Sequence, residues 1–191
     1  MSYELKSARY LAAEYLRKIL EPGDRAIDAT MGNGHDTALL CSLVGSEGHV
    51  DAFDVQPAAL ESTKSLLEAE GLLSRASLYL LGHEHMAEAV NSPVKAIVFN
   101  LGWLPGGDHG VTTRVKTTLS AIEQAMDLLQ PMGMLLVCVY PGHPEGERER
   151  DAVTELFSAL SPRDFNVLEH RFPNAGPGAP LCFAVQKQRK A

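Results

Sequence analysis

The feature that most constrains the fold is a short apolar run that leads directly into a glycine turn, residues 26–37: Ala26-Ile27-Asp28-Ala29-Thr30-Met31-Gly32-Asn33-Gly34-His35-Asp36-Thr37. From Leu39 onward the apolar residues recur at helical spacing. A strand, a tight glycine turn and a helix in this order are typical of α/β proteins that hold a nucleotide-like ligand. Gly32 and Gly34 permit a positive φ, and we expect Asp36 or Thr37 to cap the helix.

The acidic residues in and near this turn indicate which class of ligand it can bind. Asp54 ends the next apolar run, residues 49–53, where a carboxylate can accept both hydroxyls of a ribose. The dinucleotide fingerprint G-x-G-x-x-G is incomplete, because Thr37 stands at its third glycine. Asp28 and Asp36 flank the turn, where they would repel phosphates and attract a cation. S-adenosylmethionine (SAM), which carries an ammonium, a sulfonium and a ribose, therefore fits better than NAD.

Composition sets limits on the class of protein. The 191 residues, of which 45% are hydrophobic, are typical of a single globular domain, here taken as 1–191. No apolar run is long enough for a membrane helix, and we expect no membrane partner. Cys41, Cys138 and Cys182 lie far apart in apolar runs, which is typical of buried thiols in a reducing cytoplasm. The net charge of −7 argues against a broad nucleic-acid surface, although a small one stays compatible with it.

Strand and helix patterns alternate along most of the chain. Strands are expected from Ala26, at 49–53, 77–81, 95–99, 134–139, 165–172 and 181–185, and helices at 7–20, up to about 44, at 57–70, around Leu119–Leu129 with a stop at Pro131, and around 153–160. No helix separates the last two strands, so they are expected to pair antiparallel. The alternation predicts a doubly wound, mainly parallel sheet with ligands beyond the carboxyl ends of its strands. Asp28, Asp54, His83, Asn100 and Tyr140 all follow such strand ends.

A second motif, Asn100-Leu101-Gly102-Trp103-Leu104-Pro105, follows the fourth strand. It resembles the Asn/Asp-Pro-Pro-aromatic motif of methyltransferases that modify amino nitrogens. In that motif the side-chain carbonyl and a neighbouring backbone carbonyl accept hydrogen bonds from the target amine, and the aromatic ring packs on the base. Leu101-Gly102 stands here in place of Pro-Pro, so the sequence leaves open which backbone carbonyl would accept the second hydrogen bond from the amine. An ordinary loop with a core tryptophan is the alternative.

The motifs taken together resemble one small bacterial family, labelled "putative rRNA methylase", over roughly residues 7–187. The stretches that carry the resemblance are 28–37, Asp54-Val55-Gln56, Gly82-His83-Glu84, Asn100 to Asp108, and Tyr140-Pro141-Gly142-His143. Members of this family are SAM-dependent and convert 5-aminomethyl-2-thiouridine at the tRNA wobble position to its methylaminomethyl form. The resemblance implies the Rossmann-like class I methyltransferase fold: a mainly parallel seven-stranded sheet, its last strand antiparallel between two others, with helices on both faces.

The same resemblance implies a set of cofactor residues. These are Asp28, Met31, Gly32, Asn33, Gly34, His35, Asp36, Thr37, Asp54, Gln56, His83 and Asn100. Asp28 would hold the methionine ammonium, directly or through water, Asp54 would bind the ribose, and His83 would border the adenine. A solvated strand-end acid at Asp54 and a helix-capping role for His83 are the alternatives. His83-Glu84-His85 lacks the His-Glu-x-x-His spacing of a zinc site, so no metal is predicted.

Catalysis and substrate binding are assigned to the later loops. The predicted catalytic residues are Asn100, Trp103, Asp108, Tyr140 and His143, and the predicted substrate residues are Gly102, Leu104, Pro105, His109, Thr113, Arg114 and Lys116. A nitrogen nucleophile must be unprotonated, which makes Asp108, His109 and His143 the acid–base candidates. A turn role for Asp108, a phosphate contact for His143 and a solvated helix face around Arg114 are the alternatives.

The favoured function is therefore methylation of the wobble aminomethyl group, with the anticodon region of tRNA as partner and SAM as cofactor. An rRNA or small-molecule amine methyltransferase is the enzymatic alternative, and a non-catalytic SAM-binding protein is the alternative from another class. An amine-orienting asparagine favours an enzyme, since a binding protein does not need one. The oligomeric state is left open, a homodimer included.

Overall fold

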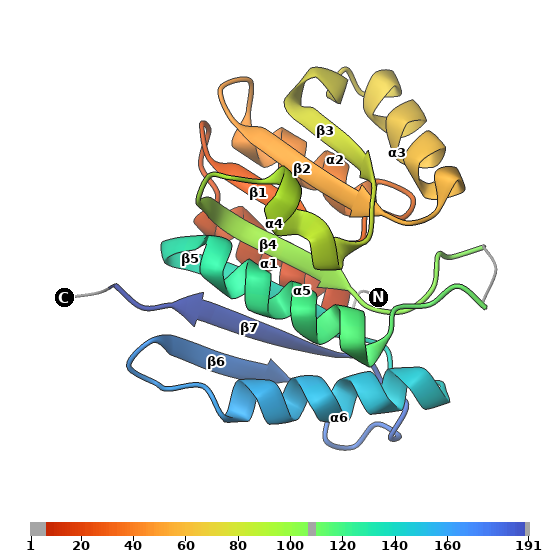
Figure 1. The fold of residues 1–191 in the computed structure, drawn as a ribbon, viewed down its shortest axis with the longest axis vertical. Coiled ribbons are helices and arrows are strands. Elements are labelled where there is room, and N and C mark those ends of the chain that lie inside the picture. The colour runs from red at the N-terminus through yellow and green to blue at the C-terminus, as the bar shows by residue number, and fades with distance from the viewer. Residues whose placement is uncertain (1–6, 107–109, 190–191) are drawn as a thin grey trace, which may run out of the picture.

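The computed structural model describes residues 7–106 and 110–189. Its strands form one sheet in the order β3-β2-β1-β4-β5-β7-β6 (Figure 1). The strands are β1 (Arg25–Asp28), β2 (His49–Asp54), β3 (Ala76–Leu80), β4 (Val94–Asn100), β5 (Leu129–Val139), β6 (Phe165–His170) and β7 (Leu181–Lys187). The helices are α1 (Ala8–Ile19), α2 (His35–Val44), α3 (Pro57–Ala69), α4 (Met86–Ala89), α5 (Val115–Leu128) and α6 (Pro144–Ser158), with short 3-10 turns η1 (Leu73–Arg75) and η2 (His83–His85).

The pairing of the strands confirms the predicted fold class. β1 to β5 run parallel, and β7 lies antiparallel between β5 and β6. The final two strands pair as a hairpin because only a loop connects them, as the sequence predicted. This is the seven-stranded sheet of class I methyltransferases, in which the carboxyl ends of the five parallel strands meet along one edge.

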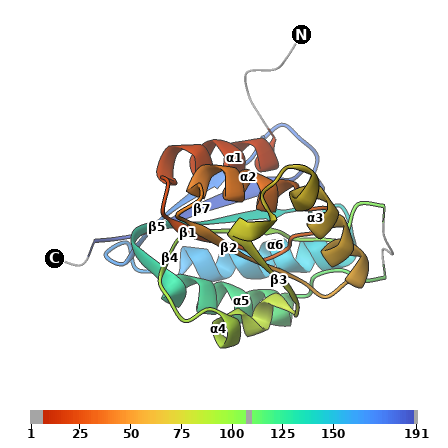
Figure 2. The same ribbon diagram turned by 90° about the horizontal axis from the view of Figure 1, so that it is seen from above.

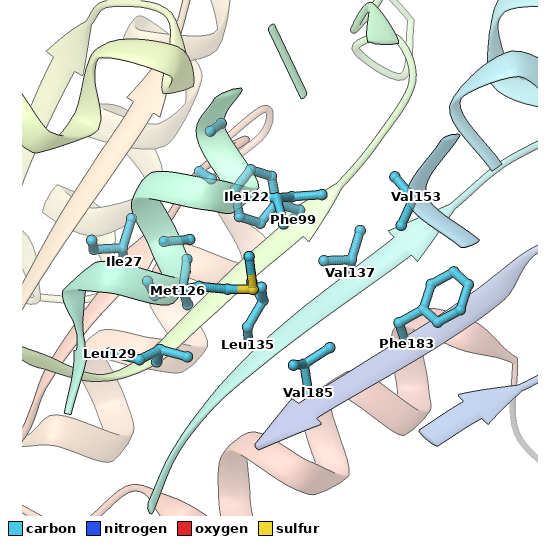
Figure 3. Packing of buried hydrophobic residues seen from close by; sticks show 14 of the residues in the cluster. Ile27, Phe99, Ile122, Met126, Leu129, Leu135, Val137, Val153, Phe183 and Val185 are labelled. Carbon is cyan, nitrogen blue, oxygen red and sulfur yellow. The ribbon is translucent and has the colours of Figure 1, made fainter. Parts of the chain in front are cut away.

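Helices cover both faces of the sheet, with α1 and α2 on one side and α4 and α5 on the other (Figure 2). Alternate residues of each strand point to opposite faces, so Ile97 and Phe99 of β4 join one core while Ala96 and Val98 join the other. Figure 3 shows the first of these cores, where side chains of β4, β5 and β7 meet Ile122 of α5 and the neighbouring α6. Burial of these apolar side chains on both faces fixes the strand register, and hence the positions of the loops at the strand ends.

Two predicted boundaries are wrong around Pro131. The helix was expected to include Leu129 and the strand to start at Met134, but α5 ends at Leu128 and β5 already begins at Leu129. Proline disfavours the helical conformation of the residue before it, so the helix ends upstream of Gln130. The first residues of β5 are irregular as a result: Met132 has a φ of 64°, and the pairing register shifts opposite the first residues of β4.

The predicted helix cap after the glycine turn is also wrong. Gly34 itself, with a φ of 82°, is the N-cap of α2, and no side chain caps the helix. Asp36 and Thr37 lie in its first turn, where the Thr37 hydroxyl donates to Asp28 at 2.7 Å. Glycine is required at position 34 for a second reason: a Cβ there would lie 2.8 Å from the Cα of Thr63 in α3.

The start of the last helix is also wrong: it was expected around 153–160, but α6 already begins at Pro144 and ends at Ser158. The remaining bounds differ from expectation by small amounts. β3 lies one residue earlier than predicted, β6 ends at His170, and β7 extends to Lys187. The three cysteines are buried free thiols, as predicted. Among residues 7–106 and 110–189, no helix has the length and apolar character needed to cross a membrane.

Candidate active site

A cavity of about 610 Å³ lies at the carboxyl edge of the parallel strands. Its walls come from the segments that follow β1, β2, β3, β4 and β5, so the structure brings together the five strand ends that the sequence singled out. The predicted residues that line it are Met31, Gly32, Asn33, His35, Asp36, Asp54, Gln56, His83, Asn100, Gly102, Trp103, Leu104, Pro105, Thr113, Arg114, Tyr140 and His143.

Some predicted site residues lie elsewhere. Gly34, Thr37 and Lys116 are outside the lining of the cavity, and Asp108 and His109 fall outside the described residues. Gly34 and Thr37 face the packed interior instead, because the tight approach of α3 and the bond to Asp28 hold them there. Lys116 projects from the exposed side of α5.

Asp28 is also absent from the cavity wall, so of the two predicted forms of contact with the methionine ammonium, the one through water suits its position, and both stay predictions. Its side chain is completely buried beneath the glycine turn. One carboxylate oxygen accepts the Thr30 N–H at 3.2 Å and the other accepts the Thr37 hydroxyl at 2.7 Å. Burial, together with the nearby charge of Asp36, raises the pKa of Asp28 to about 7. Asp28 therefore braces the turn, and its charge can respond to a cation in the cavity above.

Asp54 faces the cavity from the end of β2. Its Oδ2 accepts the Gly32 N–H at 3.1 Å and its Oδ1 accepts the Gln56 N–H at 2.9 Å. Each carboxylate oxygen keeps a second lone pair, so two further donors can be bound. The backbone thus fixes a doubly accepting group beside the glycine turn, as a ribose requires.

The wall next to Asp54 is formed by the segments after β2 and β3, where Val55, Gln56 and His83 are uncharged and Glu84 is an acid. Val55, which the sequence analysis did not single out, is 57% exposed and lines the cavity. His83 is buried with its ring 5.6 Å from that of Phe99, and burial lowers its pKa, so it is neutral at neutral pH. Such a wall suits a flat, uncharged ring such as adenine better than it suits phosphate.

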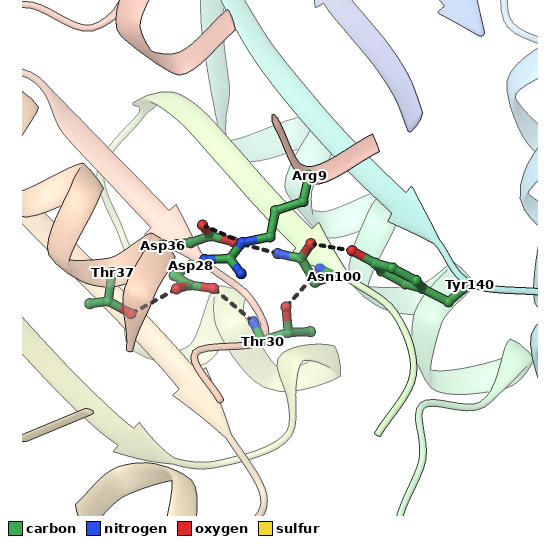
Figure 4. A network of polar contacts seen from close by, with 7 residues as sticks. All are labelled: Arg9, Asp28, Thr30, Asp36, Thr37, Asn100 and Tyr140. Carbon is green, nitrogen blue, oxygen red and sulfur yellow. Dashed lines mark hydrogen bonds and ion pairs between the residues drawn. The ribbon is translucent and has the colours of Figure 1, made fainter. Parts of the chain in front are cut away.

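Asn100 is the centre of a polar network on the other side of the cavity (Figure 4). Its Nδ2 donates to Asp36 Oδ2 at 2.7 Å, and the Tyr140 hydroxyl donates to its Oδ1 at 3.4 Å. Burial raises the pKa of Tyr140, so this hydroxyl stays protonated and remains a donor. Since a carboxylate can only accept, Asp36 determines which end of the Asn100 amide is nitrogen, and the carbonyl oxygen is left for the cavity.

Arg9 belongs to this network although the sequence analysis did not single it out. It projects from the start of α1, and its Nε lies 3.6 Å from Asp36 Oδ1 (Figure 4). The only signal in the sequence is a basic residue on an amphipathic helix, which is common on solvated helix faces. The contact exists because α1 packs across the sheet and brings its first turn to the carboxyl edge.

The loop after β4 is fastened to the segment before α5. Trp103 and Thr112 form an isolated antiparallel bridge. Gly102 exchanges two hydrogen bonds with Thr113: its N–H donates to the Thr113 hydroxyl at 2.9 Å, and its carbonyl accepts the Thr113 N–H at 3.0 Å. Thr112, which also lines the cavity, was missed because a lone threonine carries no pattern.

His143 has a structural task that its predicted acid–base role did not include. Its Nδ1 accepts the Gly146 N–H at 3.2 Å and so caps α6. The neutral ring must then carry its proton on Nε2, which leaves no free lone pair to take a proton from an amine. The ring lies 4.5 Å from that of Trp103, centroid to centroid, and so helps to hold the tryptophan in the cavity wall.

Metal ligands are not grouped in the described part of the chain. Across those residues, no three or more His, Cys, Asp or Glu side chains are arranged to hold a metal ion. His85, one of the two histidines in His83-Glu84-His85, instead pairs with Glu88 on the exposed side of α4, at 2.8 Å.

Comparison with known proteins agrees with this geometry. The family model described as "Putative rRNA methylase" matches residues 50–186. The Arabidopsis thaliana protein named "tRNA (mnm(5)s(2)U34)-methyltransferase, chloroplastic" is 36% identical over 193 residues, covering 96% of this chain and 70% of that protein.

Solved structures are similar over nearly the whole chain. A structure described as a putative rRNA-methylase from Clostridium thermocellum is 37% identical, with a TM-score of 0.95, and the match covers 97% of this chain and 100% of that one. A structure of a putative methyltransferase from Streptococcus mutans in complex with SAH (S-adenosylhomocysteine) is 35% identical, with a TM-score of 0.87, covering 96% and 99%.

Proposed function

The chain belongs to the family described as "Putative rRNA methylase", and from this premise we propose that it is a SAM-dependent N-methyltransferase. Its proposed substrate is the aminomethyl group of 5-aminomethyl-2-thiouridine at the wobble position of tRNA, and its product is the 5-methylaminomethyl form. The name of the Arabidopsis relative supports this substrate, and the complex of the Streptococcus mutans relative with SAH supports this cofactor.

The residues around the glycine turn fit SAM. Asp54 offers two oriented oxygens to a ribose, His83 and Val55 offer a neutral wall to an adenine, and the acid Asp36 suits the cationic end of the molecule. Gly32 has a φ of 49°, a conformation that favours glycine and lets a ligand approach the backbone. When bound, SAM supplies an activated methyl group on a sulfonium.

The observation that carries the proposal is the locked amide of Asn100. Its carbonyl oxygen can accept an N–H from the target amine, which holds the nitrogen lone pair in one direction. Trp103 offers a ring face on which a uracil can stack, and Arg114 at the rim can meet a phosphate. Correct positioning of this kind converts a bimolecular step into an effectively intramolecular one.

The test is methylation of a defined RNA. Purified protein and SAM are incubated with an anticodon stem-loop that carries 5-aminomethyl-2-thiouridine, and the nucleosides are then analysed by mass spectrometry. We expect the modified nucleoside to gain one methyl group, while the same stem-loop with unmodified uridine stays unchanged. Asn100→Ala protein is the negative control.

Each other result points to a different function. Methylation of rRNA or of a small amine, with no reaction on the stem-loop, would support the enzymatic alternative. Tight binding of SAH without transfer to any of these substrates would support a SAM-binding protein. In cells, tRNA from a deletion strain should lack the methylaminomethyl form.

The proposal includes a partner and a place of action. The partner is the anticodon region of tRNA, and the place is the cytoplasm, where buried free thiols such as Cys41 persist. All described strands belong to one sheet, which supports a single domain over 1–191. A homodimer stays a prediction, and light scattering of the purified protein checks it.

A further inference from the structure

Glu149 is a buried carboxylate that lies outside the cavity and has no role in the chemistry proposed so far. Glu149, on α6, is 1% exposed. Its Oε2 accepts the Thr113 hydroxyl at 2.7 Å, and its Oε1 accepts the Thr118 hydroxyl at 2.5 Å. A buried carboxylate destabilises the fold unless it is hydrogen-bonded in this way, so a plain packing role would be filled better by an apolar side chain.

The bonds of Thr113 connect Glu149 to the loop after β4. A hydroxyl has a single proton, and Thr113 donates it to Glu149. Its lone pair is thereby directed toward the loop, where it accepts the Gly102 N–H at 2.9 Å. Glu149 thus sets the direction of the hydroxyl, and the hydroxyl sets the direction of the Gly102 N–H.

This N–H belongs to the same peptide unit as the carbonyl of Leu101, the residue next to Asn100. The described peptide bonds include no cis bond, so the Leu101 carbonyl points away from the Gly102 N–H and from Thr113. The Leu101 N–H is fixed as well, since it donates to the Cys138 carbonyl at 2.9 Å. Within residues 7–106 and 110–189, no backbone N–H donates to the Leu101 carbonyl, which keeps it available to a ligand.

We infer that Glu149 is a positioning residue: through Thr113 it holds the Leu101–Gly102 peptide so that the Leu101 carbonyl becomes the second acceptor of the target amine, beside Asn100 Oδ1. This inference rests on the proposed function. It also accounts for Leu-Gly at the place of Pro-Pro. A proline ring restrains the backbone, whereas Gly102 has a φ of 141° and needs an external restraint.

Two hydrogen-bond acceptors would also distinguish the primary amine from its methylated product. A primary amine has two N–H groups, one for each acceptor, while its lone pair stays free to react. The methylated product has one N–H, so one buried acceptor would be left unpaired, which disfavours a second methylation.

Two threonine variants separate positioning from stability. Thr113→Val and Thr118→Val each remove one hydroxyl donor from Glu149, but only Thr113 contacts Gly102. For Thr113→Val we expect kcat on the aminomethyl stem-loop to fall on the order of ten- to hundredfold, with unchanged affinity for SAH. Thr118→Val should stay within about twofold of the parent in kcat, and Thr113→Ser, which keeps the hydroxyl, should restore most of the rate.

The preference for the primary amine over the methylated amine is a second measurement, and a purely structural role of Glu149 would leave it unchanged. The ratio of kcat/KM for the primary amine to that for the methylated amine should shrink about tenfold in Thr113→Val, because one hydrogen bond is lost from only the first substrate. The ratio should be unchanged in Thr118→Val. Equal losses of rate in both variants, with an unchanged ratio, would show that Glu149 only stabilises the fold.

Trp103 tests the inference independently of any substrate. It is the single tryptophan of the chain and follows Gly102 directly, so quenching of its fluorescence by acrylamide reports on this loop. Thr113→Val should increase the quenching, and Thr118→Val should not. If the parent protein fails to methylate the stem-loop, the proposed function fails while this measurement still decides the role of Thr113. Parental quenching in Thr113→Val would overturn the inference.

Discussion

The two halves of the cavity are built in different ways. On the side that we propose binds SAM (the SAM side), Asp54 is held by the backbone N–H groups of Gly32 and Gln56, which lie 22 and 2 residues away in the sequence. On the side that we propose binds the target amine (the amine side), Asn100 is held by the side chains of Asp36 and Tyr140, which lie 64 and 40 residues away. The first half needs two neighbouring strand–helix units, and the second needs helices and strands from the whole chain.

This difference predicts how the two halves respond to substitution. Backbone bonds on the SAM side survive changes of most side chains, so affinity for the cofactor depends on few residues. Side-chain bonds on the amine side each depend on two distant residues, so the rate should respond to many substitutions there. Cofactor affinity and turnover should therefore be separable.

Asn100→Ala gives the largest expected effect. We expect kcat to fall on the order of a hundredfold or more, because the amine loses the acceptor that directs its lone pair. The dissociation constant for SAH, measured by titration calorimetry, should change by less than about twofold, because Asp54 and the glycine turn are untouched. Equal losses of affinity and rate would show that the two halves are one unit.

Asp54→Ala tests the opposite half. Two ribose hydroxyls would each lose a hydrogen bond to a charged group, worth on the order of 1.5–3 kcal/mol, so affinity for SAH should fall about tenfold or more. Titration calorimetry is again the measurement. Asp127→Ala, which removes an equal charge from the exposed face of α5, is the matched control. An unchanged dissociation constant for Asp54→Ala would place the ribose elsewhere.

On the amine side, contacts with RNA phosphates should make a small electrostatic contribution to the affinity for tRNA. A protein with a net charge of −7 is expected to make few phosphate contacts, so log affinity for tRNA should fall with log salt with a slope of about −2 to −4. Replacing Arg114 and Lys116 together by Ala should flatten this slope by about 1.4 to 1.8. Trp103→Ala should lower affinity or rate at an unchanged slope, since stacking releases no counterions.

The measurement is tRNA binding across a salt series for the parent and both variants. Arg114 lies at the rim of the cavity, whereas Lys116 lies outside it, so the single variants show which of the two contributes. A parental slope in the double variant would move the RNA contact to another face, such as the loop at 173–180.

The smallest expected effect is the release of less than one proton when SAH binds. The pKa of Asp28 is raised to about 7, so near neutral pH the free protein carries this group partly protonated. A bound ammonium favours the ionised form and lowers that pKa, so binding of SAH should release protons, and affinity should rise as the pH rises through about 7. Calorimetric titrations at pH 6.5 in two buffers of different ionisation enthalpy measure the release. In Asp28→Asn the release should disappear.

The sequence determined the features that are encoded along short stretches of chain. The glycine turn, the acid at the end of β2 and the alternation of strands and helices gave the sheet and placed Asp54 and Asn100 at one edge. These features follow from local periodicity and from the rule that parallel strand ends meet. Local rules failed at the ends of elements, as at Pro131, at the cap of α2 and at the start of α6.

Only the tertiary structure decided which side chains meet. Nothing along the chain indicates that Arg9 reaches Asp36, that Glu149 holds Thr113, or that His143 caps its own helix while it packs against the ring of Trp103. Such contacts depend on how each helix is rotated and shifted on the sheet, which the packing of two apolar cores sets. The direction of the amine-binding peptide is therefore a property of the packed molecule, whereas the position of the site is a property of the sequence.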